Sequence, residues 1–424
     1  MTRAGSYQAS SDRGQSQRAV DVGLRYVVSA GHAFDGSRFL AGGAQVLVDG
    51  ARIVAVEPRR GPIAEGWPVI DRPGGTVLPG LIDTHVHLVG GGEPDALALD
   101  SGRSGAEREE VIRRSLRQQL KHGVTTVRDL GDTRFAVLDR EARDGEPSVV
   151  GSGPPITSPG GHCAAMGGAA SGAAALRAMV AQRHEHGAQA VKIVASGGAM
   201  TAGSDLLELQ FGLDDVRLVV DEAHRRGLPV TAHAHSVPSV QVCAAAGVDG
   251  LEHCTCLTAR GIHTPPALID ALAARGVQVC PTFGRLPGSP PSPQAIEVMR
   301  RTGMTLQARF EQVGALFAAG AAILAGSDAG IHPAKPHGVL AHSVAELAAS
   351  GLPAEAALAA ATSAAAEACG LGASRGRLRA GAVADLLVVE GDLAEDIEAL
   401  ARPRIVVLGG RAIPLSGDAP PARS

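Results

Sequence analysis

The stretch LPGLIDTHVHL, residues 78–88, joins an apolar run to two histidines separated by one residue. In a β-strand, residues two apart point to the same face, so the imidazoles of His85 and His87 can reach one metal ion together. The apolar residues before them are typical of a strand buried on both faces. This stretch therefore predicts a buried strand that ends at a metal site.

A weak repeat follows this stretch along the chain. Amphipathic helical segments end at a glycine, and a β-branched run comes directly after it, as at Gly123, Gly187, Gly227, Gly247, Gly276 and Gly320. Glycine just past a helix end adopts the left-handed conformation that closes the helix, and a short loop then leads into a strand. Helix and strand in regular alternation predict parallel βα units.

The repeat yields about eight strands, the number in a TIM-type barrel. They are expected to end near His87, Asp129, Thr157, Ala195, His233, His253, Thr282 and Asp328. We predict an α/β fold, a (β/α)8 barrel over residues 79–374, with a doubly wound sheet as the alternative. The barrel is favoured because residues suited to catalysis follow most of the strands.

The flanks of this region have a different pattern, with short alternating strands separated by turns. Residues 25–78 and 375–424 are expected to pair into one small β-sandwich domain. Residues 1–24 are polar and lack the apolar middle of a signal peptide, so we expect a disordered tail.

Composition excludes several classes of protein. Hydrophobic residues make up 45% and charged residues 19%, which is typical of a globular protein. A net charge of −4 without basic runs gives no support for nucleic acid as a partner, and no apolar run is long enough for a membrane span. Six cysteines in 424 residues do not form a disulfide framework, so we expect a cytoplasmic protein.

Further candidate ligands fall at or beside the expected strand ends: Lys192, His233, His253 and Asp328. A charged lysine beside two dications would be repelled. If burial lowers its pKa, the neutral amine of Lys192 can take up CO2, and the resulting carbamate has two oxygens that can bridge two metals. His235 shares a strand face with His233, so spacing alone leaves open which of the two binds metal.

The motifs VLPGLIDTHVHL, TTVRDLG, KIVASGG, VTAHAHS, GLEHC, AGSDAG and GAVADLLVV occur in this order between residues 77 and 389. In them the chain resembles the amidohydrolase superfamily, in its binuclear branch, over roughly residues 25–412. That branch includes prolidase-like and ochratoxinase-like enzymes, with imidazolonepropionase-related proteins as further relatives. The resemblance implies two divalent ions, expected to be zinc, with these ligands: His85, His87, carboxylated Lys192, His233, His253 and Asp328.

The resemblance also implies a reaction, the hydrolysis of an amide (C–N) bond in a small molecule. A hydroxide that bridges the metals would attack the carbonyl, Asp328 would move the proton, and His162 would face the substrate carbonyl. An N-acyl amino acid or a dipeptide is the expected substrate. Ring opening of a cyclic amide is the alternative reaction, and a metal-free scaffold on the same fold is the alternative outside catalysis.

Substrate contacts are harder to identify from sequence. His162, in the loop Ser158–Cys163, His235 and Arg285 are the candidates, and Arg285 can be either a carboxylate clamp or a solvated loop cation. For His332 and His337, a pocket contact and a plain surface loop are both open. Cys254 and Cys256 are expected to pack in the core, because a metal site would need a second pair. The expected partners are a small-molecule substrate and, as an option, further copies of the chain in a homo-oligomer.

Overall fold

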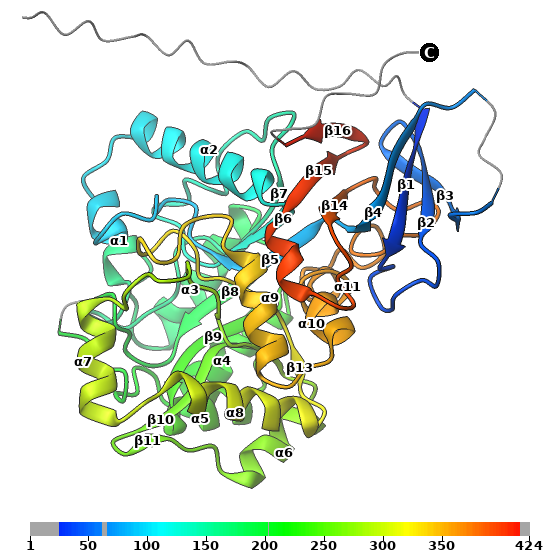
Figure 1. Ribbon diagram of the computed structural model, residues 1–424. Helices are drawn as coiled ribbons and strands as arrows, with labels where there is room; N and C mark the ends of the chain where they lie inside the picture. Colours follow the sequence, from blue (N-terminus) through cyan, green and yellow to red (C-terminus); the bar gives the residue numbers. More distant parts are fainter. Residues whose placement is uncertain (1–24, 62–65, 202, 416–424) are drawn as a thin grey trace, which may run out of the picture.

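The computed structural model describes residues 25–61, 66–201 and 203–415. The expected disordered tail, residues 1–24, lies outside the described residues, as do residues 416–424 of the expected C-terminal flank. The described chain forms a barrel and, beside it, a β domain built from both flanks (Figure 1). None of its helices is both long and apolar enough to cross a lipid bilayer.

The barrel wall contains eight strands that run parallel to their neighbours. They are β5 (Leu81–Val86), β6 (Val124–Asp129), β7 (Ser148–Gly151), β8 (Val191–Val194), β9 (Val230–Ser236), β10 (Gly250–Thr258), β12 (Gln278–Cys280) and β13 (Ala322–Ile323). A parallel bridge from Ile156 to Ile193 links the third strand to the fourth, and one from Val86 to Ala329 links the first to the last. The wall therefore closes on itself, which confirms the barrel and rules out the doubly wound sheet, whose edges stay open.

Helices connect the strands and surround the wall (Figure 1). They are α1 (Ala96–Asp100), α2 (Gly105–Lys121), η1 (Ala164–Met166), α3 (Ala173–Glu185), α4 (Leu213–His224), α5 (Val237–Ala246), α6 (Pro266–Ala274), α7 (Pro293–Thr302), α8 (Leu306–Ala318), α9 (Leu340–Ala349), α10 (Ala354–Ala360) and α11 (Ser363–Ala368), with a short strand β11 (Gly261–Ile262) against β10. Helix α5 shows the predicted glycine just past a helix end. The Ser236 side chain accepts a hydrogen bond from the Ser239 amide at its start, and Gly247 ends it with a φ of 90°.

The β domain is one seven-stranded mixed sheet in the order β16-β15-β14-β4-β1-β2-β3. Its strands are β1 (Arg25–Ala33), β2 (Ala44–Asp49), β3 (Arg52–Pro58), β4 (Val69–Pro79), β14 (Leu386–Glu390), β15 (Pro403–Leu408) and β16 (Arg411–Pro414), and a 3₁₀ turn, η2 (Ile397–Ala401), precedes β15. The antiparallel pair β4–β14 joins the N-terminal strands to the C-terminal ones (Figure 1). Both flanks contribute to a separate apolar core that includes Tyr26, Val46, Leu386 and Val407. The expected joint β domain is thus present.

The two parts meet at Gly80, between β4 and β5. A Cβ atom on Gly80 would lie 2.3 Å from Oγ1 of Thr125 on the neighbouring strand β6, so only glycine fits there without a shift. This close approach lets the chain pass from the β domain straight into the first barrel strand. That strand then ends at the histidine pair.

Candidate active site

A cavity of about 240 Å³ opens where the barrel strands end. It is lined by all six predicted metal ligands and by the three predicted substrate contacts: His85, His87, Lys192, His233, His253, Asp328, His162, His235 and Arg285. These residues come from positions as far apart in sequence as 85 and 328, and the barrel brings them to one end. Their roles as ligands and contacts remain predictions.

The first group of donors contains His85, His87 and Asp328. His85 lies in β5 and His87 directly follows it, and both side chains are buried. Their Nε2 atoms lie 3.4 Å and 3.2 Å from the same oxygen of Asp328, Oδ1. Three potential ligand atoms are therefore gathered at one point, as the H-x-H spacing predicted.

In His85 and His87, a hydrogen bond from Nδ1 orients the ring so that Nε2 faces Asp328. His85 donates from Nδ1 to the carboxylate of Glu252 at 2.7 Å, and His87 donates from Nδ1 to the carbonyl of Gly131 at 3.2 Å. Both acceptors lack a hydrogen, so each Nδ1 carries a proton, and in the neutral ring Nε2 is then the nitrogen with the lone pair. Metal-bound histidines in proteins are commonly oriented in this way.

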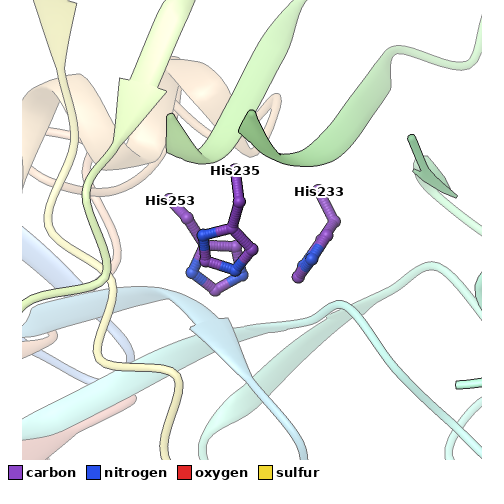
Figure 2. A group of neighbouring side chains, drawn as sticks. All are labelled: His233, His235 and His253. Carbon is purple, nitrogen blue, oxygen red and sulfur yellow. The ribbon is translucent and has the colours of Figure 1, made fainter. Parts of the chain in front are cut away.

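The second group of donors contains His233, His235 and His253, shown in Figure 2. The ring of His253 lies 4.5 Å from the ring of His233 and 4.5 Å from that of His235. His233 Nε2 donates to the carbonyl of Gly197 at 3.1 Å, which leaves Nδ1 as its free nitrogen. The structure brings His233 and His235 equally into the group, so the choice between them stays open.

The Thr282 hydroxyl fixes the remaining ring of this group. It donates to the carbonyl of Pro281 at 2.7 Å, so its oxygen accepts the 2.8 Å hydrogen bond from His253 Nδ1. His253 Nε2 is then the nitrogen with a lone pair. Each group thus offers unprotonated ring nitrogens to the cavity.

Lys192 is the buried cation of the site. It lies on β8, only 3% exposed, and its charge acts on histidines of both groups, among them His85 and His253. Burial lowers the pKa of Lys192, although the carboxylates of Glu252 and Asp328 oppose this shift. The amine is therefore more readily neutral than that of an exposed lysine.

Burial also controls the charge of the imidazoles. It lowers the pKa of His85 to about 4 and that of His235 to about 3, and it holds those of His233 and His253 well below their usual range. His87 differs, because its contact with Asp328 outweighs burial and raises its pKa. Most rings are thus neutral near pH 7, the form that binds metal.

Asp328 stays ionised although it is buried. Burial raises its pKa, but the adjacent His85 and His87 outweigh this effect, so the pKa of Asp328 is lowered. Its backbone has a φ of 56°, a conformation that residues other than glycine rarely adopt. His253 and Thr282 share this feature, so the strand ends around the cavity carry local backbone strain.

The predicted substrate contacts lie around the same cavity. His162 is buried, its Nδ1 lies 2.8 Å from the Thr201 hydroxyl, and its ring lies 4.8 Å from that of His233. Arg285 is half-buried and donates from Nη2 to the carbonyl of Ser289 at 2.6 Å. Arg285 thus lines the cavity with one N–H group held by its own loop, and the choice between carboxylate clamp and loop cation stays open.

Two open questions from the sequence receive an answer. His332 lines the cavity, whereas His337 is buried away from it, 2.9 Å from the carbonyl of Gly90. His337 is therefore not a surface residue; it lines a second pocket, beside α2, and not the cavity of the predicted ligands. Cys254 and Cys256 are buried, as expected of core residues.

Sequence reasoning missed a network behind His85. Glu252 accepts hydrogen bonds from His85, from Arg128 Nη2 at 3.1 Å and from the Thr231 hydroxyl at 2.7 Å. Both charged residues stand in strands whose side chains are almost all buried. A buried carboxylate and a buried guanidinium each need a partner, so their presence in two nearby strands was the available signal.

Lys335 was missed as well. It lies in the loop after β13, lines the cavity, and donates from Nζ to the carbonyls of Thr282 and Ser327 at 2.8 Å and 2.7 Å. No pattern in the sequence distinguishes it from an ordinary loop lysine. Only the fold-back of the loop, with a bridge between His332 and Lys335, brings it to the site.

Comparisons with known proteins agree with this arrangement. An uncharacterised protein of Mycobacterium tuberculosis is 31% identical over 357 residues, which is 82% of this chain and 88% of the relative. Ochratoxinase of Aspergillus niger is 28% identical over 212 residues, 42% of this chain and 43% of that protein. Its solved structure matches with a TM-score of 0.74 at 21% identity, over 93% of this chain and 96% of the other.

A prolidase crystallised with N-methylphosphonate-L-proline is similar over a greater length. It matches with a TM-score of 0.77 at 26% identity, covering 92% of this chain and 99% of the other. The family model described as "Amidohydrolase family" matches residues 76–413, which include the whole barrel and most of the C-terminal flank. The chain therefore belongs to the amidohydrolase family and is a hydrolase that acts on carbon–nitrogen bonds.

Proposed function

We propose that this enzyme hydrolyses the amide bond of a small N-acyl amino acid or dipeptide with the help of two divalent metal ions. The observation that carries the proposal is the convergence of two donor groups, His85–His87–Asp328 and His233–His235–His253, on one cavity. The amidohydrolase family supports the reaction type.

The donor set suits such ions. In the first group both histidines present Nε2 to the point that Asp328 Oδ1 occupies, and their other nitrogens are fixed by hydrogen bonds. Neutral imidazoles and an ionised carboxylate are common ligands of zinc. We therefore propose zinc, with His85, His87, His233, His253 and Asp328 as ligands.

Lys192 is proposed as the sixth ligand, in the form of a carbamate. It lies within electrostatic reach of both donor groups, and burial lowers its pKa. A neutral amine can add to CO2 with the loss of one proton to solvent, and the product is an anion with two oxygens. An anion there would also offset the positive charge of two dications.

When bound, the two ions would polarise the substrate carbonyl and bring the pKa of a water ligand from about 15.7 to near 7. Asp328 would take the remaining proton of the attacking water and return it to the leaving nitrogen. His162, held at Nδ1 by Thr201, has Nε2 available to stabilise the developing negative charge on the substrate oxygen. Arg285 and His235 would contact the rest of the substrate.

Two further proposals concern the cellular compartment of the enzyme and the chemical class of its substrate. All six cysteines are free thiols in the structure, which supports a reducing compartment, the cytoplasm. The similar prolidase was crystallised with an N-substituted proline, which supports an amino-acid derivative as the substrate.

The test is metal analysis joined to a substrate screen. Protein purified without chelator is expected to contain two equivalents of zinc, and the loaded enzyme is expected to cleave N-acyl amino acids or dipeptides in a panel that also contains cyclic amides. Chelation should abolish the cleavage and added zinc should restore it. A protein with two metals that opens cyclic amides only would overturn the proposed substrate class.

A further inference from the structure

Lys335 is a basic side chain that the proposed metal set does not use. Burial lowers its pKa, and the carboxylates of Asp328, Glu346 and Asp83 oppose this shift and favour its charged form. Two of its three N–H donors are held by the carbonyls of Thr282 and Ser327. An ammonium group has three donors, so one remains for a ligand in the cavity that Lys335 lines. The backbone carbonyls fix the position of Nζ without neutralising its charge.

The position of this charge relative to Asp328 limits what it can bind. Nζ contacts the carbonyl of Ser327, the residue directly before Asp328, so the ammonium lies one peptide unit from the proposed proton carrier. The charge of Lys335 also lowers the pKa of Asp328. In an N-acyl amino acid, a single carbon joins the scissile nitrogen to the carboxylate. We therefore infer that the carboxylate lies beside Lys335 when Asp328 reaches the leaving nitrogen.

Arg285 is associated with another part of the cavity, near Ser289 and His332. It follows β12 in the loop toward Ser289, and its Nη2 is bonded to the carbonyl of that residue. Its charge acts on His332 at the rim of the cavity. Arg285 is therefore placed to meet a more distant part of the substrate.

The remainder of the cavity lining, among the described residues, offers no second carboxylate to pair with a positive charge on the substrate. Among its lining residues in the described chain, Asp328 is the one carboxylate, and it lies in the donor group with His85 and His87. Glu252 lies behind His85 with all its contacts made, and Asp95 is exposed outside the cavity lining. Apolar groups form much of the wall: Leu97, Leu130, Pro155, Val194, Met200 and Ile331.

We propose that Lys335 binds the α-carboxylate of the leaving amino acid and that the site prefers N-acyl amino acids to dipeptides with a free amino group. The preference rests on the proposed function and narrows it to one substrate class. The ammonium of a dipeptide would lie against largely apolar groups and near the Arg285 guanidinium, where its desolvation is costly. An uncharged acyl group avoids that penalty.

The experiment compares three amides with the zinc-loaded enzyme. N-acetyl-L-leucine and glycyl-L-leucine differ by one amino group, and N-acetyl-isoamylamine lacks the carboxylate of N-acetyl-L-leucine. Matched sets with phenylalanine, methionine and proline as the leaving group extend the panel. We expect kcat/KM to favour the acetyl compound over the glycyl one, and to fall roughly 10- to 100-fold when the carboxylate is absent.

The variants Lys335→Met and Lys335→Arg test the assignment of the carboxylate. Lys335→Met should raise KM for N-acetyl-L-leucine by a similar factor and change the hydrolysis of N-acetyl-isoamylamine little, whereas Lys335→Arg should keep part of the discrimination. Metal content and the melting temperature report whether each variant is intact. Lys121→Met, at an exposed lysine at the end of α2, is the matched control.

Equal losses on both acetyl compounds in Lys335→Met would show a structural role and overturn the assignment. Equal or faster cleavage of glycyl-L-leucine by the wild-type enzyme would overturn the preference for N-acyl substrates. If no set is cleaved by protein that holds two zinc ions, the proposed function itself is wrong, a result distinct from the other two.

Discussion

Asp328 combines three properties that are seldom found in one residue. Its carboxylate lies within 3.4 Å of two ring nitrogens, its backbone is strained, and the lysine at position 335 contacts its neighbour in the chain. A strained backbone of this kind persists only where its surroundings hold it, and it is often found at functional sites. Asp328 is thus placed both to bind metal and to carry a proton.

Replacement of Asp328 by Asn separates these two tasks. The amide oxygen can still coordinate a metal, but it cannot accept and return a proton. We expect kcat to fall by roughly 10²- to 10⁴-fold, with a smaller change in KM. Steady-state kinetics with metal analysis checks this. A variant with full metal content and near-normal kcat would mean that another base acts, and His235 would be tested next.

Lys192→Ala removes the proposed bridge. Since the other residues of β8 are apolar and cannot supply two oxygens, we expect the variant to lose binuclear metal binding while the fold persists. Metal per chain, measured after gel filtration, is the readout, and Lys121→Ala is the control. Short carboxylic acids added to Lys192→Ala should restore part of the activity. Two metals per chain in the variant would contradict the carbamate.

The loop after β6 contains a buried carboxylate, Asp132, whose pKa is raised. Asp132 is fully buried, and its Oδ2 accepts a hydrogen bond from the Val137 amide at 2.8 Å. Burial, together with the nearby Asp129, raises the pKa of Asp132 from 3.8 to about 8. The folded protein therefore holds a proton on Asp132 in a pH range where the unfolded chain has lost it.

This difference gives a pH-dependent cost in stability. Between about pH 4 and pH 8 the folded state binds more protons than the unfolded state, so the free energy of unfolding falls as pH rises. Asp132→Asn keeps an acceptor for Val137 and does not titrate. We expect its stability relative to wild type to grow by up to about 1.4 kcal/mol per pH unit over that range.

Urea unfolding of chelator-treated protein at several pH values measures this slope without interference from metal loss. Asp144→Asn, at an exposed position in the same loop, should run parallel to wild type. A flat difference between Asp132→Asn and wild type from pH 4 to pH 8 would show that Asp132 titrates normally in the folded state.

The elements were predictable to different degrees. Strands are present at the positions expected near His87, Asp129, Ala195 and His253. They were predictable because a glycine at a helix end and a following β-branched run are local features of the sequence. The third strand ends at Gly151, before the expected Thr157, and only a bridge at Ile156 continues the wall.

The site was predictable where its residues stand on strands. His85 and His87 follow from the period of two, whereas Lys335 depends on how a loop folds back over the cavity, which local sequence does not encode. His233 and His235 could not be separated, since they share a strand and the same face. Loop geometry and the choice between equivalent neighbours are tertiary properties.

At the scale of the whole molecule, the metals should stabilise the barrel. Ions that bind only the folded state add to the free energy of unfolding, by about 2.7 kcal/mol at a hundred times Kd. We expect chelation to lower the melting temperature of the wild type, as measured by circular dichroism. Lys192→Ala, with its bridge removed, should shift much less, and an equal shift in both would point to an effect of the chelator elsewhere.

The joint sheet of the two flanks has a consequence for synthesis on the ribosome. Strand β4 pairs with β14, more than three hundred residues later in the chain, so the N-terminal strands emerge long before their partner exists. Until then β4 presents one unpaired edge, a surface prone to aggregation. A nascent chain shorter than residue 386 would thus depend on chaperones. The last strands to leave the ribosome would complete a domain that the first strands began.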